Sequence, residues 1–235
     1  MTKPFFTKTV RIATAGAFAA LMTAASASAM TLTYDGSVVG FKKVNVTEVS
    51  NAVNAGAYKM KDTTSMDSFI VFCLDLLASV YNNVDYGYTA TNTPFSNSED
   101  LSVAGAGGLT GVDRIQRLFD SGYDTALTSK TNSAGFQVAL WNAVYDDDWS
   151  VANSAGTFYQ TASNGGVRDA ANAFLSDAST YTGGQKYALT FLESTETPNR
   201  SQNLVTVSAV PVPAAGLMLL TALGGMVVAR RRKTS

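Results

Sequence analysis

Two side chains of this 235-residue chain have types that could react with each other: Cys73, the only cysteine, and Gln137, a glutamine within the apolar run FQVALW. A cysteine thiolate can attack a carboxamide carbon and expel ammonia, and the product is an internal thioester. Such a bond needs protection from water, which Phe72, Phe136 and Trp141 are candidates to provide. An external amine could then open the thioester and form an amide through Gln137.

A second interpretation of the same residues stays open. Free cysteine is among the most buried residue types and packs as a small hydrophobic side chain. Gln137 falls between Trp141 and Val144 on a helical wheel, so its carboxamide points toward apolar neighbours. Burying it without partners would cost a few kcal/mol. Gln137 must therefore react or be hydrogen-bonded in the core, and Cys73 could be unreactive.

Several other kinds of site are excluded or disfavoured. The chain has no histidine, which excludes a histidine-based triad and histidine-ligated zinc, and one cysteine excludes an intramolecular disulfide. The run Asp146 to Asp148 has calcium-binding side chains, but its spacing matches no EF-hand loop and favours a solvated acidic loop. A hydrolase that pairs Asp75 with Asp148 has no motif behind it. We predict no catalytic residues for turnover, no metal and no cofactor.

The N-terminus has the three parts of a secretory signal peptide. A basic start precedes an apolar stretch from about Ile12 to Ala25, and Ala27-Ser28-Ala29 forms a small-x-small cleavage site. The apolar stretch is short and rich in Ala and Thr, which disfavours a membrane-spanning helix. We predict that residues 1–29 are removed on export.

The C-terminus carries a second signal, in residues 210–235. The stretch from Val210 to Ala229 approaches the roughly 20 residues that a transmembrane helix needs, and a basic cluster follows, which would stay cytoplasmic. The sequence before the apolar stretch is Val210-Pro211-Val212-Pro213-Ala214, and the basic cluster is Arg230, Arg231, Arg232 and Lys233.

This tail resembles the VPLPA variant of the PEP-CTERM sorting signals, with Val212 in place of leucine. The resemblance implies recognition and cleavage by an exosortase-type sorting protease, with membrane insertion through the C-terminal helix before processing. It also implies a place at the cell surface or outside the cell, where such proteins often accompany exopolysaccharide. An uncleaved single-pass anchor is the alternative.

Residues 30–209 are long enough for one domain with a substantial core. Ten of the chain's 17 basic residues and all 18 acidic residues lie there, which gives a net charge of −8. This charge favours solubility and argues against nucleic acid as a partner.

The pattern along residues 30–209 predicts strands at both ends of an α-rich centre, and therefore an α+β fold. The expected N-terminal elements are strands around a turn at Asp35-Gly36 and a buried strand at 69–76. Thr110 and Asp113 predict the capped start of a helix that ends at Gly122. Further helices are expected at 133–145 and 167–175, followed by strands at 186–192 and 203–208.

Three segments between Phe69 and Trp149 carry another resemblance. FCLDL, a helix ending in Gly-Tyr and GFQVALW occur in the same order as the motifs of the thioester domains of bacterial surface adhesins. The resemblance implies that Cys73 and Gln137 form the thioester. Phe136 stands where adhesins favour threonine and Leu140 where they favour isoleucine, and neither difference removes a reacting atom.

Together these signals predict an exported surface protein, a matrix or adhesion component without enzymatic turnover. Covalent attachment to surface amines would proceed through the thioester. The alternative is a non-covalent structural or exopolysaccharide-associated protein in which the cysteine is buried and unreactive.

Overall fold

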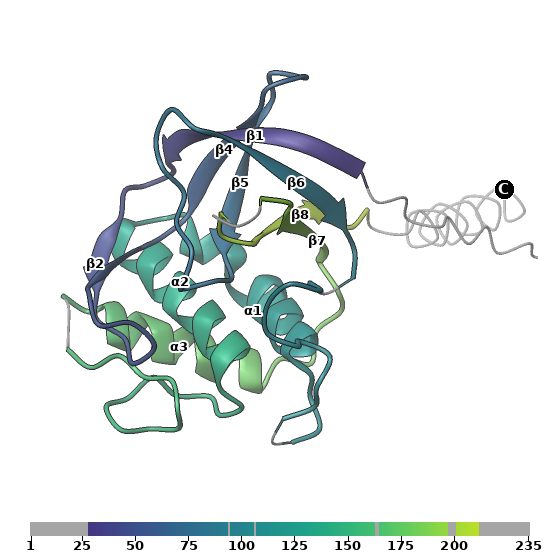
Figure 1. The fold of residues 1–235 in the computed structure, drawn as a ribbon. Coiled ribbons are helices and arrows are strands. Elements are labelled where there is room, and N and C mark those ends of the chain that lie inside the picture. Colours follow the sequence, from purple (N-terminus) through teal and green to yellow (C-terminus); the bar gives the residue numbers. More distant parts are fainter. Residues whose placement is uncertain (1–27, 94, 106, 163–164, 197–200, 212–235) are drawn as a thin grey trace, which may run out of the picture.

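The computed structural model describes residues 28–93, 95–105, 107–162, 165–196 and 201–211 (Figure 1). Six strands come first, three helices follow and two strands complete the fold, so the predicted α+β order is confirmed. The elements are β1 (Ser28–Ser37), β2 (Lys42–Val44), β3 (Val53–Ala55), β4 (Tyr58–Asp62), β5 (Ser68–Cys73), β6 (Asp85–Thr91), α1 (Gly111–Ala126), α2 (Lys130–Tyr145), α3 (Val167–Ser179), β7 (Tyr187–Ser194) and β8 (Leu204–Ala209).

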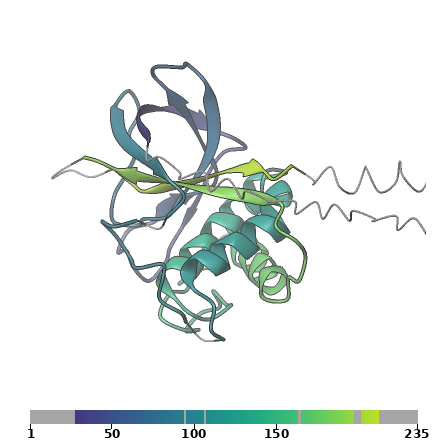
Figure 2. The same cartoon turned by 90° about the vertical axis from the view of Figure 1, so that its right-hand side faces the viewer.

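Six of the strands form a closed antiparallel barrel in the order β1-β4-β5-β8-β7-β6, and β6 pairs back with β1. The last two strands of the chain are therefore inserted between β5 and β6. Strands β2 and β3 form a separate two-stranded sheet. The three helices pack against one another as a layer on one side of the barrel, as Figures 1 and 2 show.

Two apolar clusters follow from this arrangement, and β5 divides them. Val71 and Cys73 point into the barrel, together with residues such as Leu32, Met60 and Leu204. Phe72, between them, belongs to the larger cluster formed with the helices. Alternate residues of a strand face opposite sides of its sheet, so β5 contributes to both cores.

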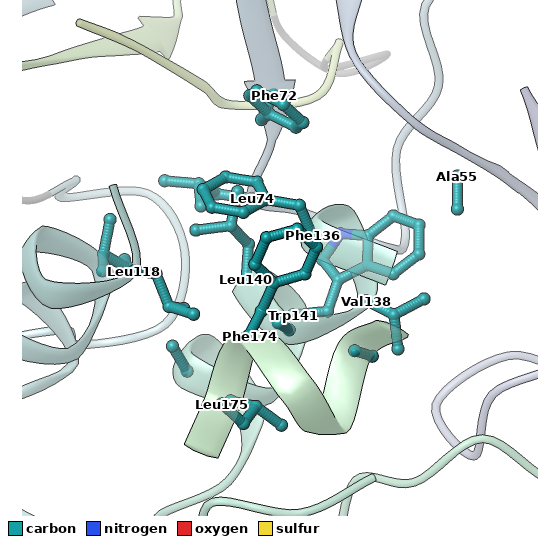
Figure 3. Close-up of a cluster of buried hydrophobic side chains, with 14 of the residues drawn as sticks. Ala55, Phe72, Leu74, Leu118, Phe136, Val138, Leu140, Trp141, Phe174 and Leu175 are labelled. Carbon is teal, nitrogen blue, oxygen red and sulfur yellow. The ribbon is translucent and has the colours of Figure 1, made fainter. Parts of the chain in front are cut away.

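The aromatic residues of the larger cluster join the helices to the barrel. In Figure 3, Phe72 points from β5 toward Phe136 of α2, and their ring centroids are 4.9 Å apart. Phe136 in turn contacts Phe119 of α1 and Phe174 of α3, at centroid distances of 5.2 and 5.3 Å. Edge-to-face aromatic pairs of this kind stabilise beyond their buried area. One ring of α2 thus lies at the meeting point of all three helices.

The capped start predicted for the first helix is confirmed. The Thr110 hydroxyl accepts from the Asp113 main-chain N–H at 3.1 Å, and the Asp113 carboxylate accepts from the Thr110 N–H at 2.9 Å. The predicted end at Gly122 is wrong, because the helix continues to Ala126. Gly122 is instead a close-packing position: a Cβ atom there would lie 2.6 Å from the Phe174 ring.

Two predicted strand features also differ. The expected turn at Asp35-Gly36 is wrong, since β1 continues to Ser37 with an irregular register between Tyr34 and Ser37. Gly36 has φ +102°, a conformation that fits a bulge within the strand. The predicted strand at 69–76 ends earlier, at Cys73. The first two residues of β1, Ser28 and Ala29, belong to the segment that the sequence assigns to the signal peptide.

The remaining signal-peptide residues, and the sorting tail from Val212 onward, lie outside the described residues. Within the ranges that are described, no helix combines the length and the apolar character required to cross a membrane. The transmembrane helix expected between Val210 and Ala229 therefore stays a prediction.

Candidate functional site

Cys73 lies at the end of β5, with its side chain inside the barrel. The residue has no solvent exposure, and its neighbours in the barrel cluster include Tyr86, Tyr88 and Leu192. The thiol is thus on the face of β5 away from the helices, because the preceding residue, Phe72, occupies the helical face.

Gln137 approaches Cys73 from the helical side and binds its main chain. The Gln137 Oε1 accepts from the Cys73 N–H at 3.0 Å, and the Gln137 Nε2 donates to the Cys73 carbonyl at 2.6 Å. The ladder between β4 and β5 ends where Tyr58 pairs with Val71, two residues before Cys73. A side-chain carboxamide therefore supplies the two hydrogen bonds that a neighbouring strand would have supplied.

The sulfur of Cys73 meets a different glutamine. The Cys73 Sγ lies 2.9 Å from the Oε1 of Gln202, in the segment that leads into β8. Since β8 pairs with β5 through Cys73 and Leu204, the strand order itself brings the two side chains together. A C=O bond is about 1.2 Å long, so the Gln202 carboxamide carbon lies within roughly 4 Å of the sulfur.

Hydrogen bonds hold Gln202 in this position at both its side chain and its main chain. The Gln202 Nε2 donates to the Asp75 carbonyl at 2.8 Å. The Tyr88 hydroxyl donates to the Gln202 carbonyl at 3.0 Å, and the next main-chain N–H, of Asn203, donates to the Asp75 carboxylate at 2.9 Å. The carboxamide is thus oriented with its oxygen toward the sulfur and its nitrogen toward Asp75.

Burial controls the ionisation of the thiol. It raises the pKa of Cys73 far above its usual range, while a hydrogen bond from the Tyr58 phenol acts in the opposite direction and the nearby Asp75 carboxylate raises it further. The pKa of Tyr58 is itself raised well above its usual value, first by burial and then by Cys73. Cys73 is therefore a neutral thiol in the folded protein, with Tyr58 as its hydroxyl neighbour.

Two of the residues predicted to shield a thioester do not lie beside the Cys73 sulfur. Phe72 and Phe136 belong to the helical cluster, on the opposite face of β5 from the sulfur, so they do not enclose it. The physical reason is strand alternation: a residue adjacent to Cys73 on a strand must point the other way. The side chains around the sulfur come from the barrel, with Tyr58, Tyr86 and Tyr88 among them.

Trp141, the third predicted shielding residue, lies beside Gln202. Both line a pocket of about 330 Å³, together with Tyr58, Asn54 and Tyr81. Trp141 is 1% exposed, and its indole N–H has no hydrogen-bond acceptor among the described residues. Gln202 is 8% exposed and is thus accessible to a small extent at this pocket.

The acidic run after α2 has a structural role that neither predicted interpretation included. The Asp146 carboxylate accepts from the main-chain N–H groups of Thr157 and Phe158, at 2.6 and 2.7 Å. The buried Arg114 guanidinium donates to the main-chain carbonyls of Asp146 and Asp148. The run lies in a loop as expected, with Asp147 exposed and Asp146 and Asp148 partly buried, and this loop in addition organises the chain around a buried arginine.

The two carboxylates considered for a hydrolase are each engaged by the main chain. Asp75 accepts from Asn203 as described, and the Asp148 carboxylate accepts from the Ser150 N–H at 3.0 Å and from the Asn142 amide at 3.1 Å. Among the residues that the structure describes, no group of three or more Cys, Asp or Glu side chains is arranged to hold a metal ion.

Sequence reasoning missed Gln202 and Tyr58. Gln202 and Asn203 are a polar pair directly before the apolar strand that begins at Leu204. That polar pair was the available signal, but only the pairing of β5 with β8 connects it to Cys73, and the two segments are far apart in sequence.

No protein-family model and no curated protein matches the chain. Solved structures of two bacterial proteins are among those that are similar to part of this chain. The N-terminal thioester domain of a surface protein from Clostridium perfringens is 10% identical, with a TM-score of 0.46 over 78% of this chain and 100% of that one. The N-terminal domain of the Streptococcus pyogenes pilus tip adhesin Cpa is 15% identical, with a TM-score of 0.45 over 66% of this chain and 85% of that one.

Proposed function

We propose that this protein attaches covalently to amines through an internal thioester between the Cys73 sulfur and the side chain of Gln202. The observation that carries the proposal is the 2.9 Å contact between the Cys73 Sγ and the Gln202 Oε1. Cys73 lies inside the barrel and has no solvent exposure. This pairing replaces the Gln137 assignment made from the sequence.

The proposed chemistry has two steps. The Cys73 sulfur attacks the Gln202 carboxamide carbon, the C–N bond breaks, and ammonia leaves with the thiol proton. An amine that enters from the surface then attacks the same carbon, the S–C bond breaks and the thiol is restored. The protein ends as a stable amide at Gln202, so it acts once and does not turn over.

The two glutamines differ in a way that supports Gln202 as the acyl group. Both polar atoms of the Gln137 carboxamide bind the main chain of Cys73, and Gln137 has no exposure. Gln202 contacts the sulfur and lines a pocket. An acyl group at Gln202 is therefore within reach of an external nucleophile, whereas one at Gln137 would be enclosed between β5 and α2.

The test is the intact mass of the purified protein. We expect a mass lower by one ammonia than the sequence requires, and methylamine should raise it by one methylamine. Fragmentation should place the methylamide on Gln202, which discriminates this residue from Gln137 without any mutation. The variants Cys73→Ser and Gln202→Ala should both have unmodified masses. An unmodified wild-type mass with a titratable thiol would refute the thioester.

We also propose that the protein works outside the inner membrane as a matrix or adhesion component. The signal-peptide pattern of residues 1–29 and the sorting pattern of residues 210–235 support this location. The exosortase-type protease would release the domain from the C-terminal helix. Cell fractionation with mass spectrometry of the mature chain tests the assignment, and a surface protein that still contained residues 230–235 would contradict cleavage.

A second candidate function is a non-covalent one, in a structural or exopolysaccharide-associated surface protein. The burial of Cys73 and its raised pKa favour this candidate, since both lower the reactivity of a thiol. The same mass measurement separates the two functions, because the second predicts the unmodified mass.

A further inference from the structure

The geometry of the barrel gives the Cys73 sulfur a hydroxyl neighbour. Tyr58 of β4 lies opposite Val71 of β5, and Val71 and Cys73, two residues apart, point into the barrel on the same face. Diagonal neighbours on one face of paired strands are within reach of long aromatic side chains. The Tyr58 side chain accordingly packs against the barrel cluster that contains Cys73, and its phenol is close enough to lower the pKa of the thiol.

The Tyr58 ring is held in place by two other aromatic residues. Its centroid is 4.7 Å from that of Phe41 and 5.8 Å from that of Tyr34, which meets it edge to face. The β4–β5 ladder fixes its main chain. The Tyr58 ring is therefore fixed against the barrel cluster that contains Cys73.

Tyr58 also lines the pocket that leads to Gln202. The hydroxyl thus connects the side from which a nucleophile would enter with the buried sulfur. Among the described residues that line this pocket, none carries a charged side chain. An amine would enter such a pocket as the neutral free base, because the pocket offers no counter-ion for an ammonium group.

The thioester chemistry proposed above needs a proton to move in each direction. When the thioester forms, the Cys73 thiol must lose its proton. When a neutral amine opens it, the attacking nitrogen must lose a proton and the leaving sulfur must gain one. The chain has no histidine for this task, and the sulfur is buried where a thiolate is strongly disfavoured.

Three other described titratable groups lie near the sulfur, and each is engaged. The Tyr86 hydroxyl accepts from the Tyr81 N–H at 2.9 Å. The Asp75 carboxylate accepts from the Asn203 N–H at 2.9 Å. The Tyr88 hydroxyl donates to the Gln202 main-chain carbonyl at 3.0 Å. Tyr58 is the group that both packs against the cluster that contains the sulfur and lines the pocket beside Gln202.

We propose that Tyr58 is a catalytic residue that carries the proton between the entering amine and the Cys73 sulfur. The amine nitrogen forms a bond to the Gln202 acyl carbon and passes a proton to the Tyr58 oxygen. As the S–C bond breaks, the Tyr58 proton passes to the sulfur. Tyr58 ends unchanged, the products are the Gln202 amide and the Cys73 thiol, and no further reactant is required.

The test compares Tyr58→Phe with Tyr34→Phe, a matched removal of a hydroxyl from the aromatic neighbour. The rate of mass gain with methylamine is measured for each protein after its thioester has formed. General acid–base groups typically contribute a factor of about 10² to 10⁴, so Tyr58→Phe should react at least about tenfold more slowly. Tyr34→Phe should react at the wild-type rate. Equal rates for all three proteins, or equal slowing in both variants, would overturn the proposal.

The inference rests on the proposed thioester, and a failure of the inference can be distinguished from a failure of the thioester. A wild-type protein of unmodified mass refutes the thioester itself, whereas a wild-type thioester that Tyr58→Phe opens at the normal rate refutes only the role of Tyr58. A folded Tyr58→Phe variant that never loses ammonia supports the role, because thioester formation also requires proton transfer. If Tyr58→Phe does not fold, the wild-type reaction is measured in heavy water, where a slower rate supports proton transfer by an exchangeable group and an equal rate overturns it.

Discussion

The carboxamide of Gln137 pairs with the main chain of Cys73 as a neighbouring strand would, through a 3.0 Å bond from the Cys73 N–H and a 2.6 Å bond to the Cys73 carbonyl. The β4 ladder has already ended at this point, so the helical layer completes the barrel strand. The position of β5, and with it the position of the Cys73 sulfur, therefore depends on a side chain of α2.

Replacing Gln137 by methionine should destabilise the fold strongly. The substitution keeps the length of the side chain but leaves a buried N–H and a buried carbonyl unpaired, at about 1–3 kcal/mol each. The free energy of unfolding, measured with urea, should fall by roughly 2–5 kcal/mol.

Gln185→Met is the control for this substitution, because Gln185 is exposed and its amide donates to the Tyr187 carbonyl at the surface. It should change stability by less than about 0.5 kcal/mol. The Gln137→Met protein that remains folded should still lose ammonia. If it instead kept its full mass while folded, thioester formation would require Gln137, and the site of the methylamide in the wild-type protein would show whether Gln137 is the acyl partner or positions β5.

Among the charged residues of the helical layer, Arg114 should be the one whose replacement lowers the stability of the fold most. Its guanidinium donates to two carbonyls of the loop after α2 and to the Asn142 side chain at 2.8 Å, and it stacks on Trp149 at 4.6 Å. Arg114→Ala removes all of these contacts at a buried position and should lower the unfolding free energy by about 3–5 kcal/mol.

Arg117→Ala provides the comparison on the same helix. Arg117 is partly exposed and donates to the Ser179 carbonyl at 3.3 Å, so its loss should cost about 1 kcal/mol or less. Similar thermal midpoints for the two variants would mean that the arginine does not organise the loop.

Gly122→Ala should destabilise the protein although alanine favours helices. A Cβ atom would lie 2.6 Å from the Phe174 ring, and forcing extra atoms into a packed core costs about 1–3 kcal/mol. This exceeds the gain of about 1 kcal/mol from helix propensity. Gly184→Ala is the matched substitution, since a Cβ there meets no atom within 4 Å. A more stable Gly122→Ala protein would contradict the close packing of α1 against α3.

The stability of the loop after α2 should decline in acid. Burial alone would raise the pKa of Asp146, but hydrogen bonds from the main-chain N–H groups of Phe158, Asp147, Thr157 and Asp148 outweigh it and hold the pKa below 3.8. A carboxyl group whose pKa is lower in the folded than in the unfolded protein stabilises the fold at pH values above its unfolded-state pKa. This contribution is lost as the pH falls through the folded-state pKa.

Asp146→Asn should therefore flatten the acid limb of the stability curve, measured by thermal unfolding from neutral pH to below 3.8. Asp177→Asn, at an exposed position late in α3, should leave the limb unchanged. An acid limb that is the same in all three proteins would remove Asp146 as its cause.

The sequence was informative wherever a local pattern decides the structure. Thr110 and Asp113 predict a capped helix start because capping needs only residues that are neighbours along the chain. Gln137 was correctly identified as a polar side chain that needs partners. A bond to a main-chain carbonyl of the core was one of the two interpretations, and the Gln137 amide does donate to the Cys73 carbonyl.

The features that sequence reasoning missed all depend on contacts between distant segments. Gly122 suggested a helix end because glycine is common at helix C-termini. The structure instead requires glycine there because the Phe174 ring of α3 leaves no room for a Cβ atom. Gln202 and Tyr58 reach Cys73 only because β8 and β4 flank β5 in the barrel. Which strands are neighbours in a barrel is a property of the whole fold, and no local window of sequence contains it.

The place of Gln202 at the start of β8 has a mechanical consequence. The chain leaves the barrel at the other end of the same strand, near Val210. Tension between a target bonded to Gln202 and a point of attachment beyond Val210 would run along β8 alone. The ladders to β5 and β7 would hold β8 in the barrel without transmitting the tension. The helices, the pocket and the remaining strands would carry none of that load.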